Sequence, residues 1–118
     1  MFHVHPRGPT FVAAVVASLA LACASSRPWE LTPSPATDLP SAFLVDGPEP
    51  AAGACPGRIR DPRDGTRLTL RRSIGGRAPS GGALGDFAVT PSDRYGGSPD
   101  RLLRVDCSTG RPLGQVPA

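Results

Sequence analysis

The chain is predicted to be mainly β, a small antiparallel sheet or open barrel of four to five short strands. Two observations predict this class. After residue 55, apolar and polar residues alternate in short runs, which is the period of half-buried strands. Segments rich in glycine, proline and aspartate separate these runs and supply the chemistry of turns.

Residues 1–22 have the features of a secretory signal peptide. Residues 1–10 contain Arg7 and two histidines without any acidic residue, and residues 11–22 carry no charge. This apolar run is too short for the roughly 20 residues of a membrane-spanning helix. The sequence therefore predicts export.

The apolar run ends in the sequence LALAC, at Cys23. This stretch resembles the lipobox of bacterial lipoproteins, in which a small residue precedes an obligatory cysteine. The resemblance implies that Cys23 becomes the mature N-terminus, carries acyl chains such as palmitate, and anchors the protein to a membrane of the bacterial cell envelope. Ordinary signal-peptide cleavage near Cys23 would instead leave a soluble secreted or periplasmic protein, and this alternative stays open.

The cysteine count bears on the same choice. The chain has three cysteines, Cys23, Cys55 and Cys107, and an odd number in an exported protein leaves one over. If Cys23 carries lipid, Cys55 and Cys107 are free to pair, and an oxidising compartment favours that bond. In the chain-entropy model, closing a loop of about 50 residues stabilises the folded state by about 4 kcal/mol.

Residues 23–54 are rich in proline, which predicts an extended, disordered tether with polyproline II character. The apolar patch at residues 42–45 is a candidate for a short edge strand that docks on the domain. The expected organisation is a signal peptide at 1–22, a lipid-anchored tether at 23–54 and a small disulfide-linked β domain at 55–118.

Residues 58–71 predict a β-hairpin, because apolar and polar residues alternate on both sides of the turn sequence DPRDG. A four-residue loop, 62–65, sets Ile59 opposite Leu68 and keeps the apolar face together. We therefore predict this register, with Gly65 in the left-handed conformation that favours glycine.

The rest of the sheet follows the same logic. Residues 72–85 contain five glycines and no sustained period, which predicts a mobile loop before a strand at 86–90. Residues 101–107 and 111–116 predict a second hairpin whose three-residue loop, 108–110, ends in the glycine that a positive φ requires.

In that second hairpin we expect Val105 to face Leu113 and Leu103 to face Gln115. The predicted apolar face of the sheet consists of Ile59, Leu68, Leu70, Phe87, Val89, Leu103, Val105 and Leu113.

The mature chain lacks the residue types on which most enzymes depend. Both histidines fall within residues 1–22, and the chain contains no lysine. This excludes Ser-His-Asp and Cys-His nucleophiles, lysine Schiff bases and zinc sites with histidine ligands. We therefore expect a protein that is not an enzyme and uses no metal and no cofactor. The alternative is an accessory to an envelope enzyme that works through aspartate carboxylates alone.

Arginine supplies all thirteen cations of the chain. The hairpin alternation places four of them on one outward face, with Arg60 directly opposite Arg67: Arg58, Arg60, Arg67 and Arg71. Such a face suits anionic lipid, acidic polysaccharide or an acidic protein surface, and nucleic acid is not expected for an exported protein. The alternative is a solvated face that results from arginine-rich codon usage, with Asp61 and Asp64 as partial counter-ions.

These observations together predict a small lipid-anchored protein of the cell envelope, held to the membrane through Cys23, whose β domain binds or scaffolds without chemistry. A soluble secreted β module that binds an anionic partner through the same four arginines is the alternative.

Overall fold

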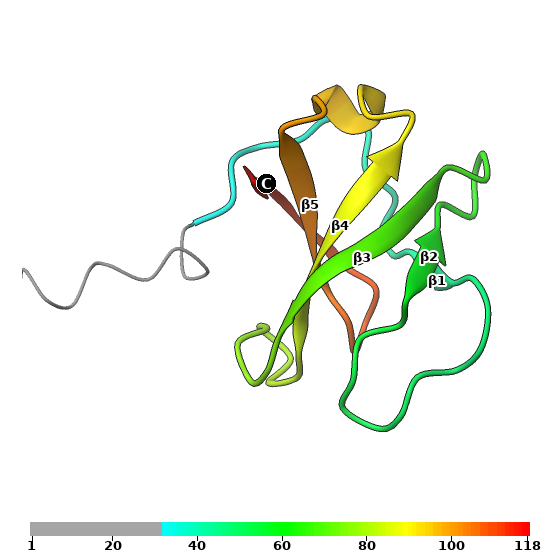
Figure 1. Cartoon of the computed structure of the whole chain (residues 1–118), viewed down its shortest axis with the longest axis vertical. Helices are drawn as coiled ribbons and strands as arrows, with labels where there is room; N and C mark the ends of the chain where they lie inside the picture. Colours follow the sequence, from blue (N-terminus) through cyan, green and yellow to red (C-terminus); the bar gives the residue numbers. More distant parts are fainter. Residues whose placement is uncertain (1–31) are drawn as a thin grey trace, which may run out of the picture. The chain divides into compact units, whose positions relative to one another are not determined.

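A computed structural model describes residues 32–118, so the predicted signal peptide at 1–22 and the predicted lipid site at Cys23 lie outside the described residues. The described chain forms one open sheet of six antiparallel strands with almost no helix (Figure 1). The mainly β class is confirmed, with six strands in place of four to five. None of the helical structure in this part of the chain is long and apolar enough to span a membrane.

The strands lie in the sheet in the order in which they occur in the chain. A single turn of 3-10 helix, η3 (Arg94–Gly96), lies between the fourth and fifth strands. The strands are β1 (Leu44–Val45), β2 (Arg58–Arg60), β3 (Arg67–Ile74), β4 (Leu84–Thr90), β5 (Arg101–Asp106) and β6 (Pro112–Pro117).

The β2–β3 hairpin has the predicted register. Ile59 lies opposite Leu68, and both side chains are almost completely buried. Gly65 has a φ of 78°, as the four-residue loop requires. A shift of one residue would expose this apolar pair, so burial fixes the register.

Strands β3 and β4 are longer than predicted, because β3 continues to Ile74 and β4 begins at Leu84. The glycine-rich connection is therefore shorter than the predicted 72–85 loop. Arg72 lies opposite Asp86 in this extension, and the two side chains form an ion pair. That cross-strand attraction carries the ladder into a stretch without an apolar period.

The β5–β6 hairpin departs from the predicted register in one place. Leu103 lies opposite Gln115 as expected, but Val105 lies opposite Pro112 and not Leu113. The register shifts between Arg104 and Val105, as at a β-bulge. Leu113 is consequently only half-buried, and the prediction that it belongs to the apolar face was wrong.

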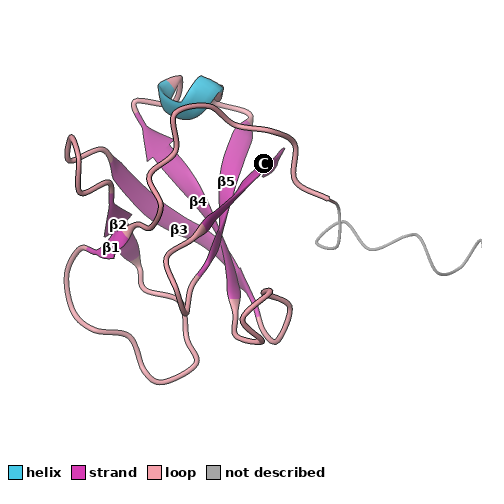
Figure 2. Ribbon diagram, turned by 180° about the vertical axis from the view of Figure 1, so that it is seen from behind, coloured by secondary structure: helices cyan, strands magenta, loops and turns pink. Residues whose placement is uncertain are grey.

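Residues 32–43 form a strap that lies across one face of the sheet (Figure 2). Near its start, Ser34 and Gln115 exchange two backbone hydrogen bonds of 2.7 and 2.8 Å, and at its end the Phe43 N–H donates to the Gly110 carbonyl at 2.8 Å. Because Gly114 has no Cβ, the backbone of Ser34 can approach β6 closely: a Cβ there would lie 2.4 Å from the Ser34 carbonyl oxygen.

The folded unit therefore begins at Thr32. The sequence predicts a tether at residues 23–54 and a domain that starts at Cys55, whereas the compact unit of the structure also contains residues 32–54. The physical reason is the apolar patch, since Phe43 enters the core and residues 44–45 pair with β2 as an edge strand. Proline prevents helix but does not prevent an extended segment from packing.

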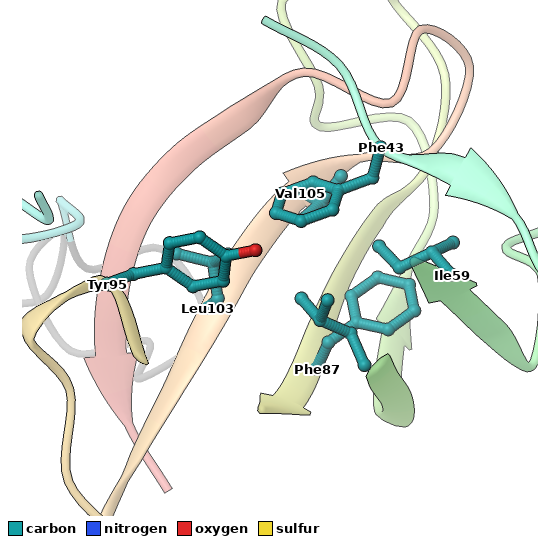
Figure 3. Packing of buried hydrophobic residues seen from close by; sticks show 7 residues of the cluster. Phe43, Ile59, Phe87, Tyr95, Leu103 and Val105 are labelled. Atoms are coloured by element: carbon teal, nitrogen blue, oxygen red, sulfur yellow. The ribbon is translucent and has the colours of Figure 1, made fainter. Parts of the chain in front are cut away.

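The core lies between the sheet and the strap (Figure 3). Phe43 from the strap meets Tyr95 from η3 edge to face, with ring centroids 5.7 Å apart. The predicted apolar face omitted both aromatics, although Phe43 belongs to the apolar patch at residues 42–45 that was expected to dock as an edge strand. The buried cluster contains Phe43, Ile59, Leu68, Phe87, Tyr95, Leu103 and Val105.

The predicted disulfide between Cys55 and Cys107 is present, with an S–S distance of 2.01 Å. It joins the chain just before β2 to the chain just after β5, over a sequence separation of 52. In the chain-entropy model this closure contributes about 4 kcal/mol. The bond therefore supports a small domain whose apolar core is thin.

Replacing Phe43 tests whether the strap belongs to the fold. Phe43→Ala removes a buried ring and is expected to lower the free energy of unfolding by about 3 to 5 kcal/mol. Leu44→Ala is the matched control, because that neighbouring side chain is exposed and should change stability by less than about 1 kcal/mol. Urea titration measures both values. Equal, small effects would contradict the placement of the strap.

Candidate anion-binding face

The four predicted arginines are all exposed. Two belong to β2 and two to β3, and together we call them the arginine face: Arg58, Arg60, Arg67 and Arg71. The register places Arg60 directly opposite Arg67, as predicted. Two like charges in directly opposed positions of a sheet destabilise it, unless a counter-charge lies between them.

Arg71 holds a different position from the other three. The β3–β4 register shifts between Leu70 and Arg72, so Arg71 lies at an irregularity and has no partner in the ladder. Its side chain is nevertheless exposed, on the same strand as Arg67. The structure thus brings three of the arginines together on the regular hairpin and places the fourth at the bulge beyond it.

Within residues 32–118, none of the four arginines of the face forms an ion pair. Four other arginines of the same region are bound to aspartates: Arg63, Arg72, Arg94 and Arg104. Four acids, Asp38, Asp61, Asp64 and Asp86, hold these other arginines, and among residues 32–118 no acid forms an ion pair with the arginine face.

Asp61 is the centre of the largest of these networks. Its fully buried carboxylate accepts a hydrogen bond of 2.6 Å from the Tyr95 hydroxyl and bonds of 3.1 and 2.8 Å from the Arg63 guanidinium. The Arg63 backbone N–H donates to the same carboxylate at 2.9 Å. Asp61 thus joins the β2–β3 turn to η3.

Two arginines extend this network to the strap. Arg63 and Arg94 each form an ion pair with Asp38, at 3.1 and 2.9 Å. Arg94 also pairs with Asp64 at 3.0 Å, and its guanidinium stacks 4.4 Å above the Tyr95 ring. Strap, turn and 3-10 helix are therefore held by one set of charges.

Hydrogen bonds shift the pKa values in this network. The Arg63 guanidinium lowers the pKa of Asp61 far below its ordinary value, against the opposing effect of burial. Burial, and then the hydrogen bond to Asp61, raises the pKa of Tyr95. Hydrogen bonds from Thr66 lower the pKa of Asp64. All three groups keep their ordinary charge states near neutral pH.

This arrangement corrects one sequence-based interpretation. The alternative of a solvated face had Asp61 and Asp64 as partial counter-ions of the arginine face, but their carboxylates bind Arg63 and Arg94. Both aspartates also stabilise the turn, since Asp61 accepts from the Arg63 N–H and Asp64 accepts from the Thr66 N–H. The aspartates of the turn sequence therefore accept hydrogen bonds within the turn itself.

A second buried carboxylate, Asp86, lies on β4 between Arg72 of β3 and Arg104 of β5. Arg104 donates to it at 2.7 and 2.9 Å, and Arg72 donates at 2.5 Å. Burial alone would raise the pKa of Asp86, but the hydrogen bonds from Arg104 and Arg72 outweigh it and lower the pKa. Asp86 is thus an ionised structural group.

An open cleft of about 400 Å³ lies at the edge strand β1, and its walls include core residues such as Phe43 and Phe87 as well as the acid Glu49. Its lining includes Leu44 and Val45 of β1, Ile59 and Arg60 of β2, and Thr109 of the β5–β6 turn. Leu44 and Val45 are the exposed large hydrophobic residues of the described chain. The sequence predicts this patch as an edge strand, without a part in a site.

Among residues 32–118 no cluster of three or more histidine, cysteine, aspartate or glutamate side chains could hold a metal ion. The guanidinium groups of the arginine face are exposed, with the exposed side chain of Leu44 opposite Arg60, and guanidinium groups can bind carboxylate or phosphate in bidentate geometry. No protein-family model, curated protein or solved structure matches the chain.

Acid is expected to destabilise the domain through Asp61 and Asp86. Both folded-state pKa values are lowered, so each carboxylate contributes stability that is present above the unfolded-state pKa of about 3.9 and is lost as the pH falls toward the folded-state pKa. Melting temperatures measured from pH 7 to pH 2 should stay level down to about pH 5 and then fall. Asp61→Asn should melt lower at pH 7 and show a shallower acid decline.

A melting temperature that rises between pH 5 and pH 3 would contradict these assignments. An Asp61→Asn profile parallel to that of the parent would remove Asp61 as a source of the acid decline.

Proposed function

We propose that this protein is a non-catalytic binding module of the bacterial cell envelope, anchored to a membrane by lipid on Cys23. Its β domain binds anionic groups through the arginine face. The proposal combines an N-terminal segment typical of exported lipoproteins with a domain surface that has excess positive charge.

The disulfide supports the proposal that the protein is exported. A bond between Cys55 and Cys107 suits an oxidising compartment, and it leaves Cys23 as the third cysteine of the chain. Lipid on Cys23 accounts for that residue. Several acyl chains at one N-terminus give stable anchoring, because each buried CH₂ contributes about 0.8 kcal/mol.

The main support for anion binding is the pair of Arg60 and Arg67, which lie opposite each other and form no ion pair in the described chain. The sheet keeps two opposed like charges although aspartates occur nearby in the same hairpin, and those aspartates bind other arginines. An anion from outside the domain would supply the missing counter-charge. Phosphate and carboxylate groups fit this role, because guanidinium groups bind both in bidentate geometry.

Binding is favoured over catalysis because the buried carboxylates already have partners. Asp61 and Asp86 are held ionised by arginines, and Asp106 accepts bonds from Ser80. A general acid or base needs a proton to exchange near neutral pH, and the lowered pKa values of Asp61 and Asp86 do not allow it.

Removing the opposed arginines tests the binding half. The protein is the mature chain, residues 23–118, with Cys23→Ser so that no acyl chain is added. Its binding is measured to vesicles of phosphatidylcholine with and without phosphatidylglycerol, and to the soluble acidic polysaccharide polygalacturonate. Replacing Arg60 and Arg67 by glutamine should weaken binding to an anionic partner on the order of 20-fold, since each cation near an anionic surface contributes about 1 kcal/mol.

The matched control replaces Arg101 and Arg111 by glutamine. Both are exposed and lie outside the arginine face, and the change in net charge is identical. This control should weaken binding by less than about threefold at 0.15 M salt, where charges more than about 8 Å from the contact are screened. Equal losses in the two double variants, or binding to neither probe, would refute the arginine face as a site.

Intact-mass spectrometry of the bacterial membrane fraction tests the anchor. The expected species begins at Cys23 and carries added acyl mass. An unmodified chain that begins at Cys23 or Ser25 in the soluble fraction would refute the anchor and favour the soluble secreted alternative.

A further inference from the structure

We propose that the anionic partner is the bilayer surface itself, and that the edge strand β1 inserts into it beside the arginine face. Leu44, which shares the face of Arg60, would enter the boundary between headgroups and acyl chains, while Arg60 and Arg67 bind lipid phosphates. This inference rests on the proposed function and assigns its ligand.

A single row of side chains across the sheet carries the proposal. Leu44 of β1 lies opposite Arg60, Arg60 lies opposite Arg67, and Arg67 lies opposite Thr90 of β4. All four side chains are exposed. Because neighbouring strands are about 4.8 Å apart, an apolar residue and two cations fall within about 10 Å along one face.

The two hydrophobic residues are exposed to an unusual degree for this domain. Leu44 and Val45 have exposed fractions of 45 and 37%, whereas the core residues that follow in the sheet are almost fully covered. Isolated exposed leucines are common on protein surfaces. Here Leu44 lies directly opposite Arg60 on the face of cations that form no ion pair in the described chain, whereas Val45 lies opposite Ile59 and belongs to the other face of β1.

Membrane interfaces favour this pairing of groups. Guanidinium groups lie at the level of the phosphates, and leucine or valine side chains gain from contact with the first methylenes below them. A soluble acidic polysaccharide or an acidic protein surface would satisfy the arginines but not the exposed edge. The bilayer is thus the anionic partner that would contact both the arginines and Leu44.

The length of chain between anchor and fold favours the same partner. Because the folded unit begins at Thr32, nine residues, 23–31, separate it from the lipid site. Even a fully extended chain of this length spans only about 30 Å. A lipid on Cys23 therefore keeps the domain next to the membrane surface, where the effective concentration of headgroups is high.

A fluorescent reporter at Leu44 tests the insertion. The mature chain with Cys23→Ser and Trp29→Phe carries no tryptophan, so Leu44→Trp introduces a single reporter. With vesicles containing phosphatidylglycerol, its emission should move to shorter wavelength, and brominated acyl chains should quench it. Ser73→Trp is the matched control, exposed near the far end of β3, and its emission should not change.

A second variant keeps the proposal falsifiable if the tryptophan perturbs the edge. Leu44→Ser should weaken partitioning into anionic vesicles about five- to tenfold, because it removes an apolar contact and leaves the cations in place. Its binding to polygalacturonate should equal that of the parent chain.

The outcomes separate this inference from the function on which it rests. Arginine-dependent vesicle binding in which the Leu44→Trp reporter stays in water and Leu44→Ser partitions like the parent would overturn the insertion and leave the arginine face standing. Arginine-dependent binding to polygalacturonate alone would assign the face to another partner and overturn the membrane inference. Binding to neither probe would overturn both.

Discussion

The buried carboxylate of Asp61 is the constraint on which most of this small domain depends. It lies in the β2–β3 turn, where it accepts hydrogen bonds from the side chains of Tyr95 and Arg63. Tyr95 in turn packs against Phe43 of the strap, and Arg63 reaches Asp38 in the same strap. A single ionised group thus couples the hairpin, η3 and the strap. A chain with so few aromatic residues needs such a network, since its apolar core alone is thin.

The same network determines which of the exposed arginines form ion pairs with aspartates. Asp61, Asp64 and Asp86 neutralise arginines that hold the fold together, and the exposed arginines of the arginine face receive none of them. The cost of opposing Arg60 to Arg67 is therefore not relieved within the described chain. The anion binding that we propose would supply a counter-charge for that pair, and the exposed Leu44 opposite Arg60 is the basis for proposing a membrane as the partner.

Local patterns predicted the parts of the fold that local forces determine. The turn DPRDG and its flanking alternation predicted the register of Ile59 and Leu68, and the cysteine count predicted the disulfide. Sequence reasoning failed where distant contacts decide. The apolar patch at residues 42–45 indicated docking at the edge, but not that Phe43 fills the core under a proline-rich strap. The bulge at Arg104 and Val105 lies in the hairpin that the strap approaches closely at Gly114. Alternation placed Arg58, Arg60 and Arg67 on one face, but it could not show the irregularity at Arg71. The partners of Asp61 and Asp64 could not be predicted either, because they are set by the tertiary structure.

Titration of the mature chain with inorganic phosphate, followed through the arginine side-chain resonances by NMR, tests the central claim most directly. If the arginine face is an anion site because its charges are uncompensated, the Nε–H signals of Arg58, Arg60 and Arg67 shift with added phosphate. The signals of Arg63 and Arg94, which are bound to aspartates, stay in place. Shifts of equal size in both groups, or in neither, would contradict the account.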